Sequence, residues 1–147
     1  MPKAIIVYGS TTGNTELLAG YISEGIKEAG IDATVRNVTD VDAQDLTNYD
    51  LVLLGSSTWG EGELQGDFIY FYDQMEGLSL EGKKGAAFGP GDSAYDMFCE
   101  AVNLLEARLK DCGAEIIAPG LKIDGDVDAS EDKAKQWGKQ AASVAIA

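Results

Sequence analysis

The strongest constraint on the fold is a short apolar segment that leads directly into a loop of glycines and hydroxyl side chains. Residues 5–8 read IIVY, and residues 9–15 read GSTTGNT. A continuous apolar run is typical of a strand that is buried on both faces of a sheet. Apolar residues then recur at helical spacing from Leu17 to Ile26, and Gly30 follows as a stop signal. The chain therefore begins with a strand, a loop and a helix, which favours an α/β fold with a parallel sheet.

The loop between this strand and helix has the composition of an anion-binding site. Glycines let the backbone turn its N–H groups inward, and the following helix N-terminus favours negative charge. No Lys, Arg or His occurs between Ala4 and Gly25, so the donors would be neutral, and the P-loop lysine is missing. We expect a phosphomonoester here; an ordinary turn with a Ser/Thr helix cap is the alternative. The candidate ligands are Ser10, Thr11, Thr12, Gly13, Asn14 and Thr15.

Composition limits the classes of partner. The 147 residues have the length of one domain, which we expect to span residues 1–147. The formal net charge of −14 disfavours nucleic acid and anionic membranes, and favours proteins with a basic docking face. The alternative is that acidity merely keeps the chain in solution. The chain has no His, which excludes imidazole metal ligands and Ser–His catalysis.

Hydrophobic periodicity predicts five strands and four helices. The predicted strands are Lys3–Tyr8, Asp32–Asn37, Leu51–Gly55, Gly85–Phe88 and Ile116–Ile123, the last broken at Pro119 and Gly120. The predicted helices are Asn14–Ala29, Gly66–Met75, Ser93–Cys112 and Ala129–Val144.

The two cysteines and the lack of a membrane-length apolar run bear on location. Cys99 and Cys112 lie thirteen residues apart on one predicted helix, about 20 Å along its axis, so they cannot form a disulfide with each other. No segment resembles a membrane span or the apolar part of a signal peptide. The sequence therefore predicts a cytoplasmic protein with free thiols.

Two further loops follow the third and fourth predicted strands, at the sheet edge where open α/β proteins bind ligands. In the first, Trp59 is flanked by Thr58 and Gly60 and is well placed to stack on a flat ring. In the second, residues 89–94 form a tight loop and Tyr95 offers another stacking surface. The alternatives are that Trp59 folds back on the surface and that Tyr95 is an ordinary helix residue. A phosphate site and two aromatic rings together favour a heteroaromatic phosphomonoester.

Acidic residues gather in the same loops, where they either form a solvated rim or lower the potential of a redox ring by their negative field. They are Glu61, Glu63, Asp67, Asp92, Asp96 and Glu100. A second acidic segment, residues 124–128, begins like a calcium loop. It lacks the required Gly at Ala129 and the closing Glu at Lys135, so no metal site is predicted.

These motifs resemble those of the short-chain flavodoxins, in particular the flavodoxins of sulfate-reducing bacteria. The resemblance extends from Lys3 to about Val144. Residues 9–15 resemble the phosphate loop of that family, and residues 57–60 and 91–95 resemble its two isoalloxazine loops. The implied fold is a three-layer α/β/α sandwich with a five-stranded parallel sheet in the order 2-1-3-4-5. Its fifth strand would be uninterrupted, without the insertion of long-chain members.

The resemblance implies a site for non-covalent FMN between Trp59 and Tyr95. The carbonyl of Gly60 would accept a hydrogen bond from flavin N5–H and so stabilise the neutral semiquinone. Backbone groups of Asp92, Met97 and Cys99 would bind the pyrimidine edge. Pro90 removes one N–H from that loop. Besides the phosphate-loop residues, the implied FMN-binding residues are Ser57, Thr58, Trp59, Gly60, Glu61, Pro90, Gly91, Asp92, Tyr95, Met97, Phe98 and Cys99.

The implied function is low-potential one-electron transfer between the semiquinone and hydroquinone of FMN, with no residue that acts on a substrate. The implied partners are redox proteins with basic docking faces, such as hydrogenases, cytochromes and ferredoxin-linked oxidoreductases, and we expect a monomer. A small FMN-dependent quinone or nitro reductase is the alternative, although the three loops contain no Lys or Arg for a nicotinamide dinucleotide. A receiver domain would need acidic residues where Gly9, Ser10, Gly55 and Ser56 stand.

Overall fold

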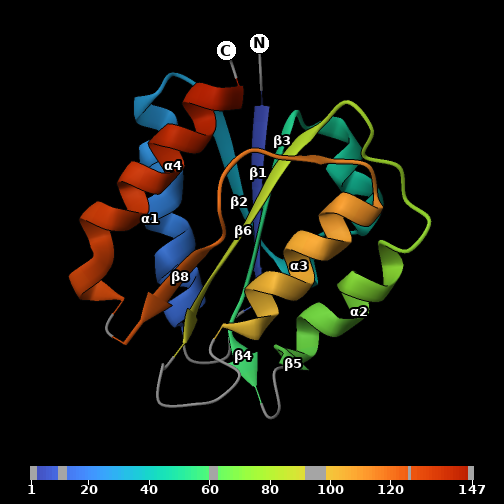
Figure 1. The fold of residues 1–147 in the computed structure, drawn as a ribbon, viewed down its shortest axis with the longest axis horizontal. Helices are drawn as coiled ribbons and strands as arrows, with labels where there is room; N and C mark the ends of the chain where they lie inside the picture. Colours follow the sequence, from blue (N-terminus) through green and yellow to red (C-terminus); the bar gives the residue numbers. More distant parts are fainter. Residues whose placement is uncertain (1–2, 10–12, 60–62, 92–98, 126, 146–147) are drawn as a thin grey trace.

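The computed structural model describes residues 3–9, 13–59, 63–91, 99–125 and 127–145. A parallel sheet forms the middle layer, with α1 and α4 on one face and α2 and α3 on the other (Figure 1). The strands are β1 Lys3–Gly9, β2 Asp32–Asn37, β3 Leu51–Ser56, β4 Thr58–Trp59, β5 Glu63–Leu64, β6 Lys84–Gly91, β7 Glu115–Ile116 and β8 Leu121–Asp124. The α-helices are α1 Asn14–Glu28, α2 Gly66–Gln74, α3 Glu100–Asp111 and α4 Glu131–Ala145. Short 3-10 helices are η1 Val38–Asp40, η2 Ala43–Asn48 and η3 Asp128–Ser130.

The order of the main sheet confirms the predicted topology. Its strands follow the sequence β2-β1-β3-β6-β7, with β8 also paired to β6, and all these pairings are parallel. In terms of the five predicted strands this is the order 2-1-3-4-5. The small pair β4–β5 is antiparallel and separate from the main sheet.

Alternating side chains of the central strands supply a core on each face of the sheet. Ile5 and Val7 of β1 pack on the side of α2 and α3, whereas Ile6 packs on the side of α1 and α4. All three are 1% exposed or less. A strand with both faces buried has to be apolar at every position, which is why β1 and β3 were predictable from sequence.

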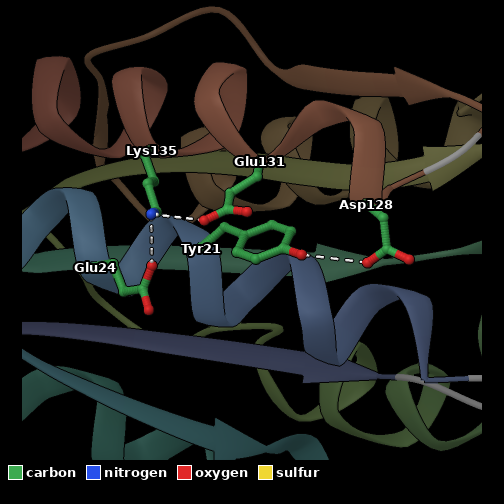
Figure 2. Close-up of polar contacts among 5 residues, drawn as sticks. All are labelled: Tyr21, Glu24, Asp128, Glu131 and Lys135. Atoms are coloured by element: carbon green, nitrogen blue, oxygen red, sulfur yellow. Dashed lines mark hydrogen bonds and ion pairs between the residues drawn. The ribbon is translucent and has the colours of Figure 1, made fainter.

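Helices α1 and α4 approach each other closely enough to bring backbone against backbone. A Cβ on Gly25 would lie 2.0 Å from the Lys135 carbonyl oxygen, and one on Gly138 would lie 2.4 Å from that of Ile22. At the surface, side chains also join α1 to α4 and to η3, which precedes α4 (Figure 2). The Tyr21 hydroxyl donates to Asp128 at 3.2 Å, and Lys135 pairs with Glu24 and Glu131 at 3.2 and 2.7 Å.

These surface contacts matter less for stability than the close helix packing. Hydrogen bonds to Glu131 and then Glu24 raise the pKa of Lys135 above its usual value. The charged atoms remain open to water, where ion pairs contribute little. The glycine contacts instead fix the distance between α1 and α4, and thereby hold the helix that follows the predicted phosphate loop.

Gly20 and Gly25 of α1 differ in whether an added Cβ has room, and this difference can be tested. It lies in the helix, and a Cβ added there would meet no atom within 4 Å, so Gly20→Ala should stabilise the protein by about 0.5–1 kcal/mol through helix propensity. Gly25→Ala should lower stability despite the same gain in propensity, because its Cβ would meet backbone. Denaturant unfolding of both variants checks this; destabilisation by Gly20→Ala would contradict it.

Several boundaries differ from those predicted. The fourth predicted strand continues to Gly91, because β8 pairs with its second half from Phe88↔Leu121 to Gly91↔Asp124. Gly89, Pro90 and Gly91 are therefore strand residues, not a tight loop. Pro90 is tolerated because the β3–β6 register ends at Gly55↔Phe88, so its missing N–H removes no ladder bond on that side.

The third predicted helix and the fifth predicted strand also need correction. Among the described residues, helix α3 begins at Glu100, and Cys99, with a left-handed φ of 50°, interrupts the predicted helix Ser93–Cys112. Residues 93–98 of that prediction lie outside the described residues. The two cysteines thus flank α3 and do not both lie within it. The fifth strand is not continuous, because residues 117–120 separate β7 from β8. This corrects the uninterrupted strand implied by the resemblance, and it confirms the break at Pro119 and Gly120 that the sequence pattern predicted.

Candidate cofactor site

Three neighbouring strands end at one edge of the sheet, where the predicted loops begin. Gly9 at the end of β1 is paired with Ser56 at the end of β3, and β6 ends beside them at Gly91. The hairpin β4–β5 projects from this edge, and the start of β1 and the end of α4 lie at the opposite edge (Figure 1). The strand ends from which the loops after β1, β3 and β6 start therefore lie together, as predicted from the topology.

The described part of the first loop has the features of an anion site. Gly13 caps α1 with a left-handed φ of 93°, a conformation that glycine adopts at little cost. Thr15 lies in the first turn of the helix and is 1% exposed. Its Oγ1 is buried and has no hydrogen-bond partner among the described residues. A buried donor without a partner is costly, so this hydroxyl fits the phosphate of a bound ligand at the positive end of α1.

The second loop is organised as a short hairpin, which the sequence did not predict. Thr58 pairs with Leu64 and Trp59 with Glu63, so β4 and β5 lie antiparallel. At the base of the hairpin the Gln65 N–H donates to Ser56 Oγ at 2.9 Å, and Ser56 Oγ donates to the Ser57 carbonyl at 2.8 Å. Ser56 is fully buried and Gln65 is 4% exposed.

At the third loop, the described residues are the end of β6 and the start of α3. The Cys99 thiol donates to the Gly89 carbonyl at 3.6 Å, which ties the helix start to the strand end. Burial raises the pKa of Cys99 to about 11, so the group remains a neutral thiol at physiological pH. It therefore acts as a packing residue and a hydrogen-bond donor, not as a reactive thiolate.

The predicted binding residues are thus placed unevenly. Gly13, Asn14, Thr15, Ser57, Thr58, Trp59, Pro90, Gly91 and Cys99 lie at this edge, the backbone of Thr58 and Trp59 forming β4. Nine predicted residues lie outside the described residues: Ser10, Thr11, Thr12, Gly60, Glu61, Asp92, Tyr95, Met97 and Phe98.

Two polar residues, Ser56 and Gln65, anchor the second loop, and the sequence did not predict this role. Ser56 reads as the last residue of a buried strand, and Gln65 is not among the usual helix-capping residues. Gln65 nevertheless caps α2, since its Oε1 accepts from the Phe68 N–H at 3.2 Å. Nothing local in the sequence distinguishes this glutamine from an exposed one.

Comparison with known proteins decides the family. The sequence model of the family described as flavodoxin matches residues 6–137. The chain belongs to the flavodoxin family. It is 52% identical over 141 residues to a flavodoxin of Maridesulfovibrio salexigens, covering 94% of this chain and 95% of that relative. It is 45% identical to a flavodoxin of Nitratidesulfovibrio vulgaris, with 93% and 95% covered.

Solved structures agree with this membership. Oxidised flavodoxin 2 of Bacillus cereus superposes with a TM-score of 0.90 at 39% identity, covering 96% of this chain and 98% of that one. The two sulfate-reducer relatives support the predicted short-chain type. As a flavodoxin, the chain is a small FMN-binding electron-transfer protein, and the alternative of a reductase receives no better support. Among the described residues, no helix has the length and apolar character to cross a membrane.

Proposed function

We propose that the N-terminus of α1 holds the phosphate of FMN, with Thr15 as a direct donor. The observation that carries this proposal is the buried Thr15 hydroxyl, which has no hydrogen-bond partner among the described residues and lies two residues after the left-handed Gly13. A phosphate oxygen would accept from this hydroxyl and from backbone N–H groups at the helix start. The remaining phosphate-loop residues predicted from sequence complete the proposed subsite.

The flavin ring is proposed to lie against the hairpin β4–β5 and the end of β6. Support comes from the shared sheet edge, because Gly9 and Ser56 are paired neighbours and β6 adjoins β3. The ring loops predicted from sequence start from these two strands. When bound, FMN supplies the one-electron chemistry, and the chain binds, orients and shields it.

Thr15→Val tests the phosphate subsite. Loss of a hydrogen bond to a charged group should weaken FMN binding at least about tenfold, while riboflavin, which lacks the phosphate, should bind as before. The apoprotein should become more stable, by about 1 kcal/mol, because the unpartnered hydroxyl is gone. Fluorescence titration and denaturant unfolding measure these opposite effects.

Thr15→Ser is the matched control, since it keeps the hydroxyl and loses only a methyl group. It should retain most of the FMN affinity. Equal loss of FMN and riboflavin in Thr15→Val, or an unchanged FMN affinity, would refute a direct contact between Thr15 and the phosphate.

The partners are proposed to dock by a basic face on the acidic surface beside the cofactor loops. A groove of about 370 Å³ lies between residues 38–42 and helix α2, and Asp42 and Asp67 line it. Tyr70 also lines the groove and is 72% exposed, so its ring can receive a lysine or arginine side chain. The proposed assembly is transient between monomers, and the two buried free thiols fit a reducing, cytoplasmic setting.

A further inference from the structure

Gln65 joins three segments that the cofactor site requires. Its backbone N–H closes the base of the β4–β5 hairpin by donating to Ser56 Oγ. Its side chain caps α2 through Phe68 and donates from Nε2 to Asp67 at 3.1 Å. Its Oε1 also lies against Gly9, where an added Cβ would be only 2.6 Å away.

The contact with Gly9 places this side chain at the start of the phosphate loop. Gly9 is the last residue of β1 and immediately precedes residues 10–12. The hydrogen bond from the Gln65 N–H to Ser56 reaches the start of the second loop, because Ser56 is the last residue of β3. Gln65 therefore contacts both strand ends, Gly9 through its buried side chain and Ser56 through its backbone N–H. Its hydrogen bonds with Asp67 and Phe68 hold that side chain in place at the start of α2, so the two loop starts share one anchor.

We propose that Gln65 is a positioning residue that fixes the spacing between the phosphate subsite and the ring subsite of FMN. This inference rests on the proposed function of the two loops. Gln65 touches neither part of the ligand in this account; it acts through Gly9 and Ser56. A ligand that spans both subsites gains from their correct spacing, whereas a ligand that occupies only one does not.

Binding of three ligands to the apoprotein distinguishes an effect on the spacing of the subsites from an effect on either subsite alone. The ligands are FMN, riboflavin and inorganic phosphate. Gln65→Ala removes the contact with Gly9 and should weaken FMN at least about tenfold. Riboflavin and phosphate, each bound alone, should keep their affinities within about twofold, because each subsite is intact. Isothermal titration measures all three.

Gln65→Met provides the discriminating variant. Methionine has nearly the length of glutamine but cannot cap α2, so both variants lose the same hydrogen bonds. FMN affinity should recover in Gln65→Met relative to Gln65→Ala, although both apoproteins should melt below the unchanged protein because neither variant caps α2. Asn37→Ala is a control that removes a different cap, because the Asn37 side chain accepts from the Thr39 N–H at the start of η1. It should lower the melting temperature without changing FMN affinity.

Each remaining outcome overturns the proposal. Equal FMN affinities in Gln65→Met and Gln65→Ala would reduce Gln65 to a helix cap. An equal loss of riboflavin affinity in Gln65→Ala would mean that Gln65 acts only on the β4–β5 hairpin and not on the spacing. Unchanged FMN affinity in Gln65→Ala, beside a loss in Thr15→Val, would refute the spacing role while leaving the phosphate subsite intact; no loss in either variant would instead refute the proposed function.

Discussion

Replacing Asp40 and Asp67 together by Lys should slow electron transfer to a positively charged redox protein by about ten- to a thousandfold at low ionic strength. Both residues are exposed, Asp67 lines the groove beside α2, and Asp40 lies two residues from Asp42 on its other side. The double change would turn an attractive approach into a repulsive one at the surface where we place the partner. Stopped-flow mixing of reduced flavodoxin with a basic cytochrome measures the second-order rate.

A matched pair at the opposite edge of the sheet separates local docking from net charge. Glu81 and Asp111 are exposed near the start of β6 and the end of α3. Their replacement by Lys changes the formal charge of −14 by the same four units. This control should slow the reaction much less, and high salt should bring the two variants together. Equal slowing by both pairs would show that net charge alone steers the partner.

The features that sequence predicted depend on local pattern. Strand β2 was predicted with its observed bounds, Asp32–Asn37, and the apolar runs of β1 and β3 identified the centre of the sheet. These strands have a short-range signature, because burial on two faces demands apolar residues at consecutive positions. The strand order followed from the resemblance to flavodoxins, and the structure confirms it.

The features that sequence missed depend on distant partners. Strand β6 extends to Gly91 only because β8, more than thirty residues later, pairs with its second half. Cys99 has a left-handed backbone conformation that favours glycine, so the pattern predicted helix through it. Gln65 became part of the site through Gly9, Ser56 and Phe68, and no local rule selects that combination.

Gly89 is the position where a single methyl group should damage fold and site together. A Cβ there would lie 2.2 Å from the Ser56 carbonyl oxygen and 3.0 Å from Val102 Cγ2. The first of these atoms is backbone in the adjacent strand β3, so relief requires the strand ends to separate. Gly89→Ala should therefore lower the free energy of unfolding of the apoprotein by about 2–3 kcal/mol.

The same displacement should reach the cofactor, because Ser56 also anchors the β4–β5 hairpin through its hydroxyl. We expect FMN affinity to fall by about a hundredfold in Gly89→Ala. Gly85→Ala on the same strand is the control: its nearest contacts are 3.2 Å to the Val52 carbonyl oxygen and 3.3 Å to Leu109 Cδ1, so shifts of a few tenths of an ångström relieve them. It lies at the far end of β6 and should cost less stability and leave FMN binding unchanged. Equal losses of FMN affinity in the two variants would mean that the spacing of β3 and β6 at their carboxyl ends does not control the site.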